Sequence, residues 1–358
     1  MVTLGVTVLA TGGGIYAYYT LQGNITAADV DGLLGSRRPI DNSTTDPTTG
    51  QNAQNILVMG SDTRALADGT GDEYGGEIAD PGARSDTTVL VHLAADRRSA
   101  TLVNIPRDSM VQLPGCERGD GTTVPAKVAM FDTAFSEAGP ACTIRTVEAL
   151  TGTRVDHYVV VDFSGFRGMV DALGGVTICT PVDIDDTRAD LHLSAGTHPD
   201  VDGETALAYA RVRYSLGDGS DIERISRQQA LMSSMVQKLT STGTLARPDR
   251  LYAFLDAATA SVTTDPGLAD LVDDVRLAQS LQKVPADGVR FLSVPTEPYP
   301  GNPARVQWTS EAPALWDSVR ADTVGSPPAD TGSLEVGGST PIPTAPVTGR
   351  VASDDICA

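Results

Sequence analysis

The sequence lacks the signatures of several common classes of enzyme. It contains no Gly-x-x-x-x-Gly-Lys-[Ser/Thr] loop, which disfavours an ATP-driven P-loop enzyme. It contains no Gly-x-Ser-x-Gly turn of the kind that carries the nucleophile of α/β hydrolases. The four histidines do not have the spacing of metal ligands, and no internal repeat is present. The chemistry of this chain must therefore be sought among its carboxylates and arginines.

Positive charge is scarce. The chain has 26 Lys and Arg against 46 Asp and Glu, which gives a formal net charge of -20. Such a protein repels a nucleic-acid backbone, so general nucleic-acid binding is disfavoured. The hydrophobic share of 41% and the charged share of 20% are typical of a globular protein. A site for an anionic ligand must then be a focused cluster of arginines and not a broad basic surface.

Charge is absent altogether from residues 1–28, and residues 2–19 (VTLGVTVLATGGGIYAYY) form a nearly continuous apolar run. A run of this length can span a bilayer, and its aromatic end suits the membrane interface. We predict a transmembrane anchor at residues 1–22, with a cleaved signal peptide as the alternative. A buried helix is a third alternative, although three consecutive glycines at 12–14 would be costly there.

Cysteine is limited to four residues. An even number of cysteines behind an apolar N-terminal segment favours disulfides in an oxidising compartment. We predict that Cys116 pairs with Cys142, on either side of a loop rich in glycine and charge. Cys179 would then pair with Cys357 and tie the C-terminal tail to the core. The alternative is that these are buried free thiols.

The chain divides into an anchor, a turn-rich linker at 23–52, a domain at 53–322 and a Pro/Gly/Ser/Thr-rich tail at 323–358 that we predict to be disordered. Within the domain, strands are predicted at 55–60, 89–94, 100–105, 155–161, 176–179 and 290–294. Helices are predicted over 127–151 with a break at Gly139-Pro140, and at 163–173, 204–211, 221–240, 249–261, 266–282 and 310–321. Residues 183–203 are interpreted as an acidic loop. Alternation of strands and helices indicates an α/β sheet with helical layers.

Three of the predicted strands carry an acid and an arginine at one end. The acids are Asp62, Asp86 and Asp108, and the arginines are Arg64, Arg84 and Arg107. In layered α/β folds, ligand groups gather where strand ends meet loops. The alternative is that the aspartates only form turns and caps.

A second set of arginines follows later in the chain. Arg211 and Arg213 lie two residues apart, while Arg224 and Arg227 lie three apart in a predicted helix, where Asp221 and Gln228 share their side. Guanidinium forks bind phosphate oxygens in a bidentate manner, so these residues indicate a phosphate or pyrophosphate site. A solvated, salt-bridged helix face is the alternative. Asp62 and Asp86 could share a hard divalent cation, Mg²⁺ or Mn²⁺, which together with the arginines would stabilise phosphoryl transfer.

Taken together, these segments resemble the LytR–CpsA–Psr family of cell-envelope proteins. The segments that carry the resemblance are 55–64 (NILVMGSDTR), 83–87 (ARSDT), 104–108 (NIPRD), 161–163 (VDF), 210–213 (ARVR) and 221–229 (DIERISRQQ). They occur in the order of the family and cover roughly residues 53–241.

The resemblance implies a single-pass membrane protein with an extracellular three-layer α/β/α domain around a central mixed sheet. Members attach glycopolymers, carried on a polyprenyl (pyro)phosphate lipid, to peptidoglycan during cell-wall assembly. An apolar tunnel for the lipid would be lined by the helix at 163–173 and by strand residues such as Val159 and Val161, which are equally suited to an ordinary core. No nucleic-acid partner is implied.

The resemblance also assigns site residues. The metal-associated acids are Asp62 and Asp86. Beyond the resemblance, we predict a catalytic set of Asp86, Arg107, Arg84 and Asp108, in which no base is obvious and either Asp86 or Asp108 could serve as one. The pyrophosphate-binding residues are Arg84, Arg107, Arg211, Arg213, Arg224, Arg227, Gln228 and Asp221.

One departure concerns the segment Lys127-Val128-Ala129, where members of the family usually carry Lys-x-Asn. One polar contact to the substrate is therefore absent or replaced. Two other functions remain open: a non-catalytic sensor of polyprenyl phosphate or transcriptional attenuator, and a polyprenyl pyrophosphatase that uses water as the acceptor.

Overall fold

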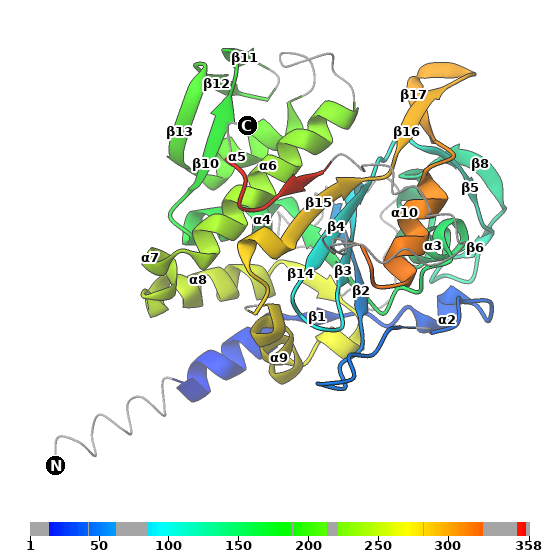
Figure 1. Ribbon diagram of the computed structural model, residues 1–358, viewed down its shortest axis with the longest axis horizontal. Coiled ribbons are helices and arrows are strands. Elements are labelled where there is room, and N and C mark those ends of the chain that lie inside the picture. Colours follow the sequence, from blue (N-terminus) through cyan, green and yellow to red (C-terminus); the bar gives the residue numbers. More distant parts are fainter. Residues whose placement is uncertain are drawn as a thin grey trace, which may run out of the picture.

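A mixed eight-stranded sheet forms the centre of the molecule, in the order β1-β14-β9-β2-β3-β4-β15-β18 (Figure 1). The computed structural model describes residues 14–41, 43–61, 85–187, 189–212, 221–281, 283–324 and 349–355. The strands of the sheet are β1 (Thr26–Ala27), β2 (Gln54–Ser61), β3 (Ser85–Leu93), β4 (Ala100–Ile105), β9 (His157–Asp162), β14 (Val262–Thr264), β15 (Val289–Ser293) and β18 (Arg350–Val351). Strands β2, β4, β9 and β15 run in one direction, and β3 runs against its neighbours β2 and β4.

Helices cover both faces of this sheet, which confirms the predicted α/β fold (Figure 1). On one face lie α2 (Asp31–Leu34), α3 (Thr133–Thr151) and α10 (Ala312–Arg320). The other helices are α4 (Phe163–Ala172), α5 (Gly203–Arg211), α6 (Asp221–Thr240), α7 (Thr242–Leu245), α8 (Pro248–Thr259) and α9 (Leu271–Leu281), with short 3₁₀ turns at Pro266–Leu268 and Ala286–Gly288.

The principal core lies between the sheet and the α2, α3 and α10 layer. Side chains that point to this face from adjacent strands, such as Leu57, Leu90 and Val103, are fully buried against residues such as Phe131 and Trp316. Helix α3 bends at Ala138 and Gly139, where the sequence predicted a break, and ends at Gly152 in the left-handed conformation. Residues 127–130, predicted as helix, instead form strand β8 (Lys127–Met130), paired with β5 (Met110–Leu113).

A second, smaller core lies under α5 and α6. Strands β10 (Val176–Thr180) and β13 (Gly196–Val201) form one hairpin, and β11 (Ile184–Asp186) and β12 (Leu191–Leu193) form another. The interpretation of residues 183–203 as a loop was therefore wrong. Ile184 and Leu191 are buried in this core, and Leu193 and Val201 pack against it. The alternation Leu191-His192-Leu193 is too short to show strand periodicity in an otherwise polar stretch.

The stretch at 23–52, predicted as a linker, packs against the domain. β1 pairs with β14 at the edge of the sheet, and Val30 and Leu34 enter the principal core. Arg38 Nη2 lies 2.7 Å from Glu148 Oε1 and donates to Val155 O at 2.6 Å. Glu148 is 5% exposed, so this ion pair holds the segment to α3 in a nearly dry environment.

The predicted disordered tail also contributes to the sheet, because β18 pairs with β15. Ala352 is fully buried next to it. The remaining paired segments are β6 (Cys116–Glu117) with β7 (Thr123–Val124), and β16 (Thr296–Tyr299) with β17 (Asn302–Trp308).

Residues 14–24 form a helix, and only Ile25 separates it from β1. Gln22 fixes the end of this helix: its Nε2 donates to Ala269 O at 2.7 Å, and its Oε1 accepts from Leu271 N at 2.8 Å. Tyr16 and Tyr19, in contrast, are 71% and 70% exposed. Within the described residues, no helix combines the length and the apolar character needed to cross a membrane. Most of the predicted anchor, residues 1–13, lies outside the described part of the chain.

The predicted disulfide between Cys116 and Cys142 is present and joins the β6–β7 hairpin to α3. Cys179 is also disulfide-bonded, while its predicted partner Cys357 lies outside the described residues. No free cysteine occurs in the described part of the chain.

Native protein is accordingly expected to show no thiol that reacts with Ellman's reagent in denaturant, and four such thiols after reduction. Reduction should also lower the free energy of unfolding by about 3 kcal/mol for the Cys116–Cys142 loop alone, because the cross-link restricts the unfolded chain. Titration before and after reductant, and urea denaturation of both forms, measure the two effects. Reactive thiols in the unreduced protein would contradict the disulfide assignment.

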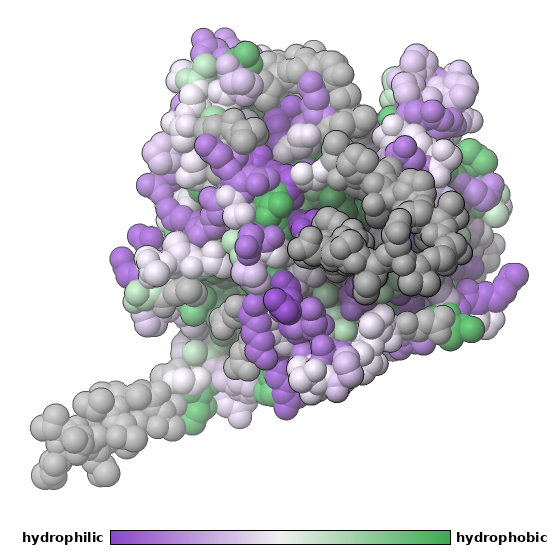
Figure 2. Space-filling view, viewed as in Figure 1, coloured by the Kyte–Doolittle hydropathy of each residue, from purple (hydrophilic) through white to green (hydrophobic). Residues whose placement is uncertain are grey.

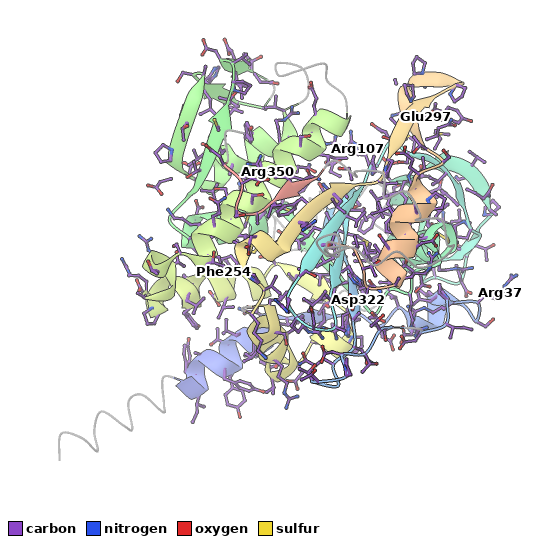
Figure 3. All side chains as sticks on the ribbon, viewed as in Figure 1. Arg37, Arg107, Phe254, Glu297, Asp322 and Arg350 are labelled. Atoms are coloured by element: carbon purple, nitrogen blue, oxygen red, sulfur yellow. A yellow bond between two sulfur atoms is a disulfide. The ribbon has the colours of Figure 1, made fainter. Side chains whose placement is uncertain are left out.

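Replacing Arg38 by alanine should lower the free energy of unfolding by about 3 kcal/mol, because it leaves the Glu148 carboxylate buried without its partner. The matched control is Arg37→Ala, since Arg37 is the adjacent residue and is exposed (Figure 3). Urea denaturation followed by fluorescence measures both. Equal stability of the two variants would show that residues 23–52 behave as a linker.

Candidate active site

The predicted site residues that the structure describes lie at or next to one edge of the sheet, at the carboxyl ends of β2, β4, β9 and β15. Ser61 ends β2 and is in register with Asp162 of β9 and with Ser85, where the antiparallel β3 begins. Asn104 of β4 is in register with Ser293, the last residue of β15. Four segments that are distant in sequence therefore end at the same place, as the strand-end pattern predicted.

Antiparallel pairing of β3 and β4 brings Asp86 to Arg107. Thr88 is in register with Ile105, so the beginning of β3 lies beside the turn that follows β4. Arg107 Nη1 forms an ion pair with Asp86 Oδ1, and the side chains remain 12% and 24% exposed, respectively. Figure 3 shows Arg107 beyond the end of β4. The charges of this pair stay within reach of a ligand at the edge of the sheet.

Asp108 has a different environment. It is 7% exposed, and its Oδ1 accepts a hydrogen bond from Arg305 Nη1 of β17 at 2.8 Å. The backbone carbonyl of Asp108 also accepts from Val306 N at 3.3 Å. Asp108 thus anchors the β16–β17 hairpin beside the site. Both carboxylates are therefore paired with an arginine, and Asp108 is the more buried of the two.

Arg211 reaches the same edge from the end of α5. Its guanidinium lies 5.2 Å from the centroid of the Phe163 ring, at the start of α4. Asp162 caps that helix, because its side chain accepts a hydrogen bond from Gly165 N at 2.7 Å. The cap makes Phe163 the first residue of α4. A side chain at Gly60 of β2 would come within 3.7 Å of Phe163, so the ring lies directly over the end of β2. The cation–π contact holds Arg211 there.

Helix α6 places two buried arginines next to this edge. Arg224 and Arg227 are 5% and 7% exposed, and Arg227 Nη2 donates to Val212 O at 2.6 Å. Two residues further on, Gln229 Nε2 donates to Leu292 O at 3.3 Å and to Ser293 Oγ at 3.2 Å, at the end of β15. Burial raises the pKa of Tyr209, and the nearby positive charge of Arg227 opposes this shift. The alternative of a solvated helix face does not hold for Arg224 and Arg227. Gln228 is half-buried.

Several predicted residues fall outside this description. Asp62, Arg64, Arg84 and Arg213 lie outside the described residues, as does the side chain of Asp221. Among the described residues there is no group of three or more His, Cys, Asp or Glu that could hold a metal ion. In the segment that departs from Lys-x-Asn, Lys127 Nζ lies 2.5 Å from Glu137 Oε1.

Sequence reasoning did not assign roles to Phe163, Gln229 or Arg305. Phe163 and Gln229 belong to segments that carried the resemblance, directly after Asp162 and Gln228. This position in the sequence was the only indication that they lie near the candidate site. Arg305 lies far from every motif, and only the pairing of Ser109 with Val306 brings it to Asp108. No local pattern could have identified it.

Beyond the arginines, the face of the sheet under α4 and α6 carries a partly exposed apolar strip. We define this strip as Val58, Val91, Leu102, Val159 and Val161, all of which are half-buried although they lie on interior strands. On the opposite face of the same strands, Leu57, Leu90 and Val103 are fully buried. On the face seen in Figure 2, the coloured residues are mostly hydrophilic or neutral, so a half-buried apolar strip on interior strands is a distinct feature of the fold. Val159 and Val161 belong to none of the buried core clusters.

The chain thus has an α/β fold, with arginines at the carboxyl ends of its strands. Comparison with known proteins agrees. The sequence matches the LytR_cpsA_psr family over residues 17–315. It is 33% identical over 303 residues to the cell wall biosynthesis protein LcpA of Corynebacterium glutamicum, covering 76% of this chain and 56% of that protein.

A second relative is the polyisoprenyl-teichoic acid–peptidoglycan teichoic acid transferase TagT of Bacillus subtilis, 31% identical over 249 residues, which cover 68% of this chain and 70% of TagT. Among solved structures, the LytR-Csp2A-Psr enzyme from Actinomyces oris has the same fold, with a TM-score of 0.60 at 22% identity, over 82% of this chain and 95% of that one. The chain belongs to the LytR_cpsA_psr family. It spans about half of the length of LcpA.

Proposed function

We propose that this protein is a phosphotransferase that moves a glycopolymer from a polyprenyl (pyro)phosphate carrier to peptidoglycan in cell-wall assembly. The observation that carries the proposal is the junction of two surfaces. Arginines from the β4 turn, α5 and α6 lie at or next to one edge of the sheet, and the apolar strip lies on a face of the sheet that reaches this edge. A lipid-linked diphosphate has the same two parts, a compact anion joined to a long apolar chain.

The names of the relatives support this choice. TagT is named as a transferase of polyisoprenyl-linked teichoic acid to peptidoglycan, and one solved structure of similar fold is TagT bound to LI-WTA. LcpA is named as a cell wall biosynthesis protein. The glycopolymer that this chain transfers is defined only by class: a polymer linked through phosphate to a polyprenyl carrier.

The chemistry follows from the positions of the charged groups. Arg107, Arg211, Arg224 and Arg227 hold the diphosphate and neutralise the charge that develops on it. A hydroxyl of peptidoglycan attacks the phosphorus that carries the glycopolymer, and a new O–P bond forms. The bond to the bridging oxygen breaks, and polyprenyl phosphate leaves. Asp86 takes the proton of the attacking hydroxyl, since it is the more exposed of the two candidate carboxylates.

A divalent cation fits this arrangement. Asp86 provides a hard carboxylate oxygen at the sheet edge, and Asp62 would provide the second acid. Mg²⁺ is usually held by one or two carboxylates together with substrate phosphates and water, and Mn²⁺ accepts the same ligands. The cation would supply additional neutralisation of the phosphate charge.

We further propose that the domain lies outside the cell, anchored by the N-terminal helix. The disulfides favour an oxidising compartment. The exposed tyrosines Tyr16 and Tyr19 suit a membrane interface. The lipid carrier of the donor resides in that same membrane.

Arg107→Ala is expected to lower glycopolymer transfer at least about 100-fold, because it removes a cation that faces the reacting phosphate. Arg227→Lys should lower transfer by about tenfold, since it keeps the charge but loses the bidentate fork. The control is Arg247→Ala, because Arg247 is an exposed arginine directly before α8 that pairs with Asp249. A lipid-diphosphate donor and a peptidoglycan acceptor report the rate, and thermal melts confirm folding. Wild-type rates in folded Arg107→Ala protein would reject the assignment.

Removal of divalent cations with EDTA should reduce transfer by at least about tenfold, and added Mg²⁺ should restore it. Asp86→Asn should raise the Mg²⁺ concentration needed for half-maximal binding of inorganic diphosphate, as measured by calorimetry. If diphosphate binding is independent of Mg²⁺ in both proteins, the cation has no place in this site. Hydrolysis of the donor without transfer would instead identify a pyrophosphatase, and binding without either reaction would identify a sensor.

A further inference from the structure

One buried polar side chain near the site has no hydrogen-bond partner. Asn104 of β4 is 2% exposed, and neither its Nδ2 nor its Oδ1 makes a hydrogen bond. An amide group that is removed from water and left unpaired is costly, so buried amides nearly always have a partner. The position of Asn104 therefore calls for a group that is supplied from outside the fold.

Strand geometry shows which face Asn104 occupies. Its neighbours along β4, Val103 and Ile105, point into the principal core. Asn104 therefore points to the opposite face, because successive side chains on a strand alternate. In register with it across the sheet are Val89 of β3 and Ser293 of β15, and Val58 is in register with Val89. Asn104 therefore lies on the same face of the sheet as Val58 of the apolar strip, with the buried Val89 between them.

The same register brings Asn104 beside the arginine helix. Ser293 accepts the hydrogen bond from Gln229 of α6, two residues after Arg227. In the other direction along the chain, Asn104 precedes Arg107 by three residues. The amide thus lies at the sheet edge, three residues before Arg107 and next to the end of β15 that Gln229 of α6 contacts.

We propose that Asn104 is a binding residue for the donor: its Nδ2 donates a hydrogen bond to a phosphate oxygen of the lipid-linked diphosphate, where the anion meets the apolar chain. This inference rests on the proposed function, and it adds which residue of β4 contacts the anion. An isoprenoid chain has no acceptor for the amide, whereas the phosphate that carries the chain has several. A water that accompanies the phosphate supplies the hydrogen for Oδ1.

Thr101 provides a matched control on the same strand. It is 1% exposed, and its Oγ1 also lacks a partner. Thr101 lies on the same side of β4 as Val103 and Ile105, because every second residue of a strand points to the same face. It therefore points away from the apolar strip and toward α3 and α10. Replacing Thr101 by valine removes an unpaired hydroxyl that is buried on the face of the sheet away from the proposed site of the lipid-linked diphosphate.

The test compares Asn104→Leu, Asn104→Asp and Thr101→Val in the full chain, purified in detergent. Calorimetry measures binding of geranylgeranyl diphosphate and of inorganic diphosphate, and thermal melts measure stability. Asn104→Leu should weaken binding of both probes by about tenfold, because a hydrogen bond to a charged oxygen is lost. Asn104→Asp should weaken binding further through repulsion. Thr101→Val should stay within about twofold of the wild type, and neither Asn104→Leu nor Thr101→Val should lower the melting temperature.

Each other result contradicts the proposal. Unchanged binding by Asn104→Leu would show that the amide does not touch the anion. A weaker affinity for geranylgeranyl diphosphate with unchanged affinity for inorganic diphosphate would assign the contact to the chain. A lower melting temperature of Asn104→Leu would show that the amide is satisfied in the free protein. If the wild type binds diphosphate but transfers nothing, only the proposed function fails; if it binds no diphosphate, both fail.

Discussion

The structure of the site depends on the burial of two guanidinium groups in a protein of net charge -20. Arg224 and Arg227 are more than nine-tenths buried, and a buried cation is stable only when its donors are directed at acceptors. Arg227 uses Val212 O at the end of α5, and Gln229 uses the end of β15. These contacts lock α6 between the small core and the main sheet, so the arginines cannot move away to solvent.

That constraint explains why the site has a polar and an apolar part. Helix α6 is held at the carboxyl end of β15, and Phe163 holds the start of α4 over the end of β2. The valines of the apolar strip, on the face of the sheet beneath these two helices, are only half-buried. A sheet face closed along its whole length would have no space for an apolar chain, and one fully open would not be stable in water. Arg224 and Arg227 lie next to the edge of the sheet at one end of this face and are themselves buried.

Much of the site could be predicted from the sequence, because its residues occur at strand ends and in a periodic helix. The pairing of Asp86 with Arg107 follows once β3 and β4 are recognised as adjacent antiparallel strands. The environment of Asp108 could not be predicted, because Arg305 comes from a hairpin almost two hundred residues later. The strands in 183–203 were missed because their stability comes from tertiary burial of Ile184 and Leu191 and not from local propensity. Residues 23–52 were interpreted as a linker for the same reason: turn-forming composition does not reveal a single buried ion pair such as Arg38 with Glu148.

The direct passage from the helix at 14–24 into β1 has a mechanical consequence. A flexible tether would let the domain sample many heights and tilts above a surface to which its N-terminus is attached. Here a single residue separates helix from sheet, and Gln22 clamps the junction at both its amide atoms. With the N-terminus anchored as proposed, the distance of the arginine-lined edge from the membrane would be set by the dimensions of the folded domain, and both proposed substrates would have to meet at that one distance.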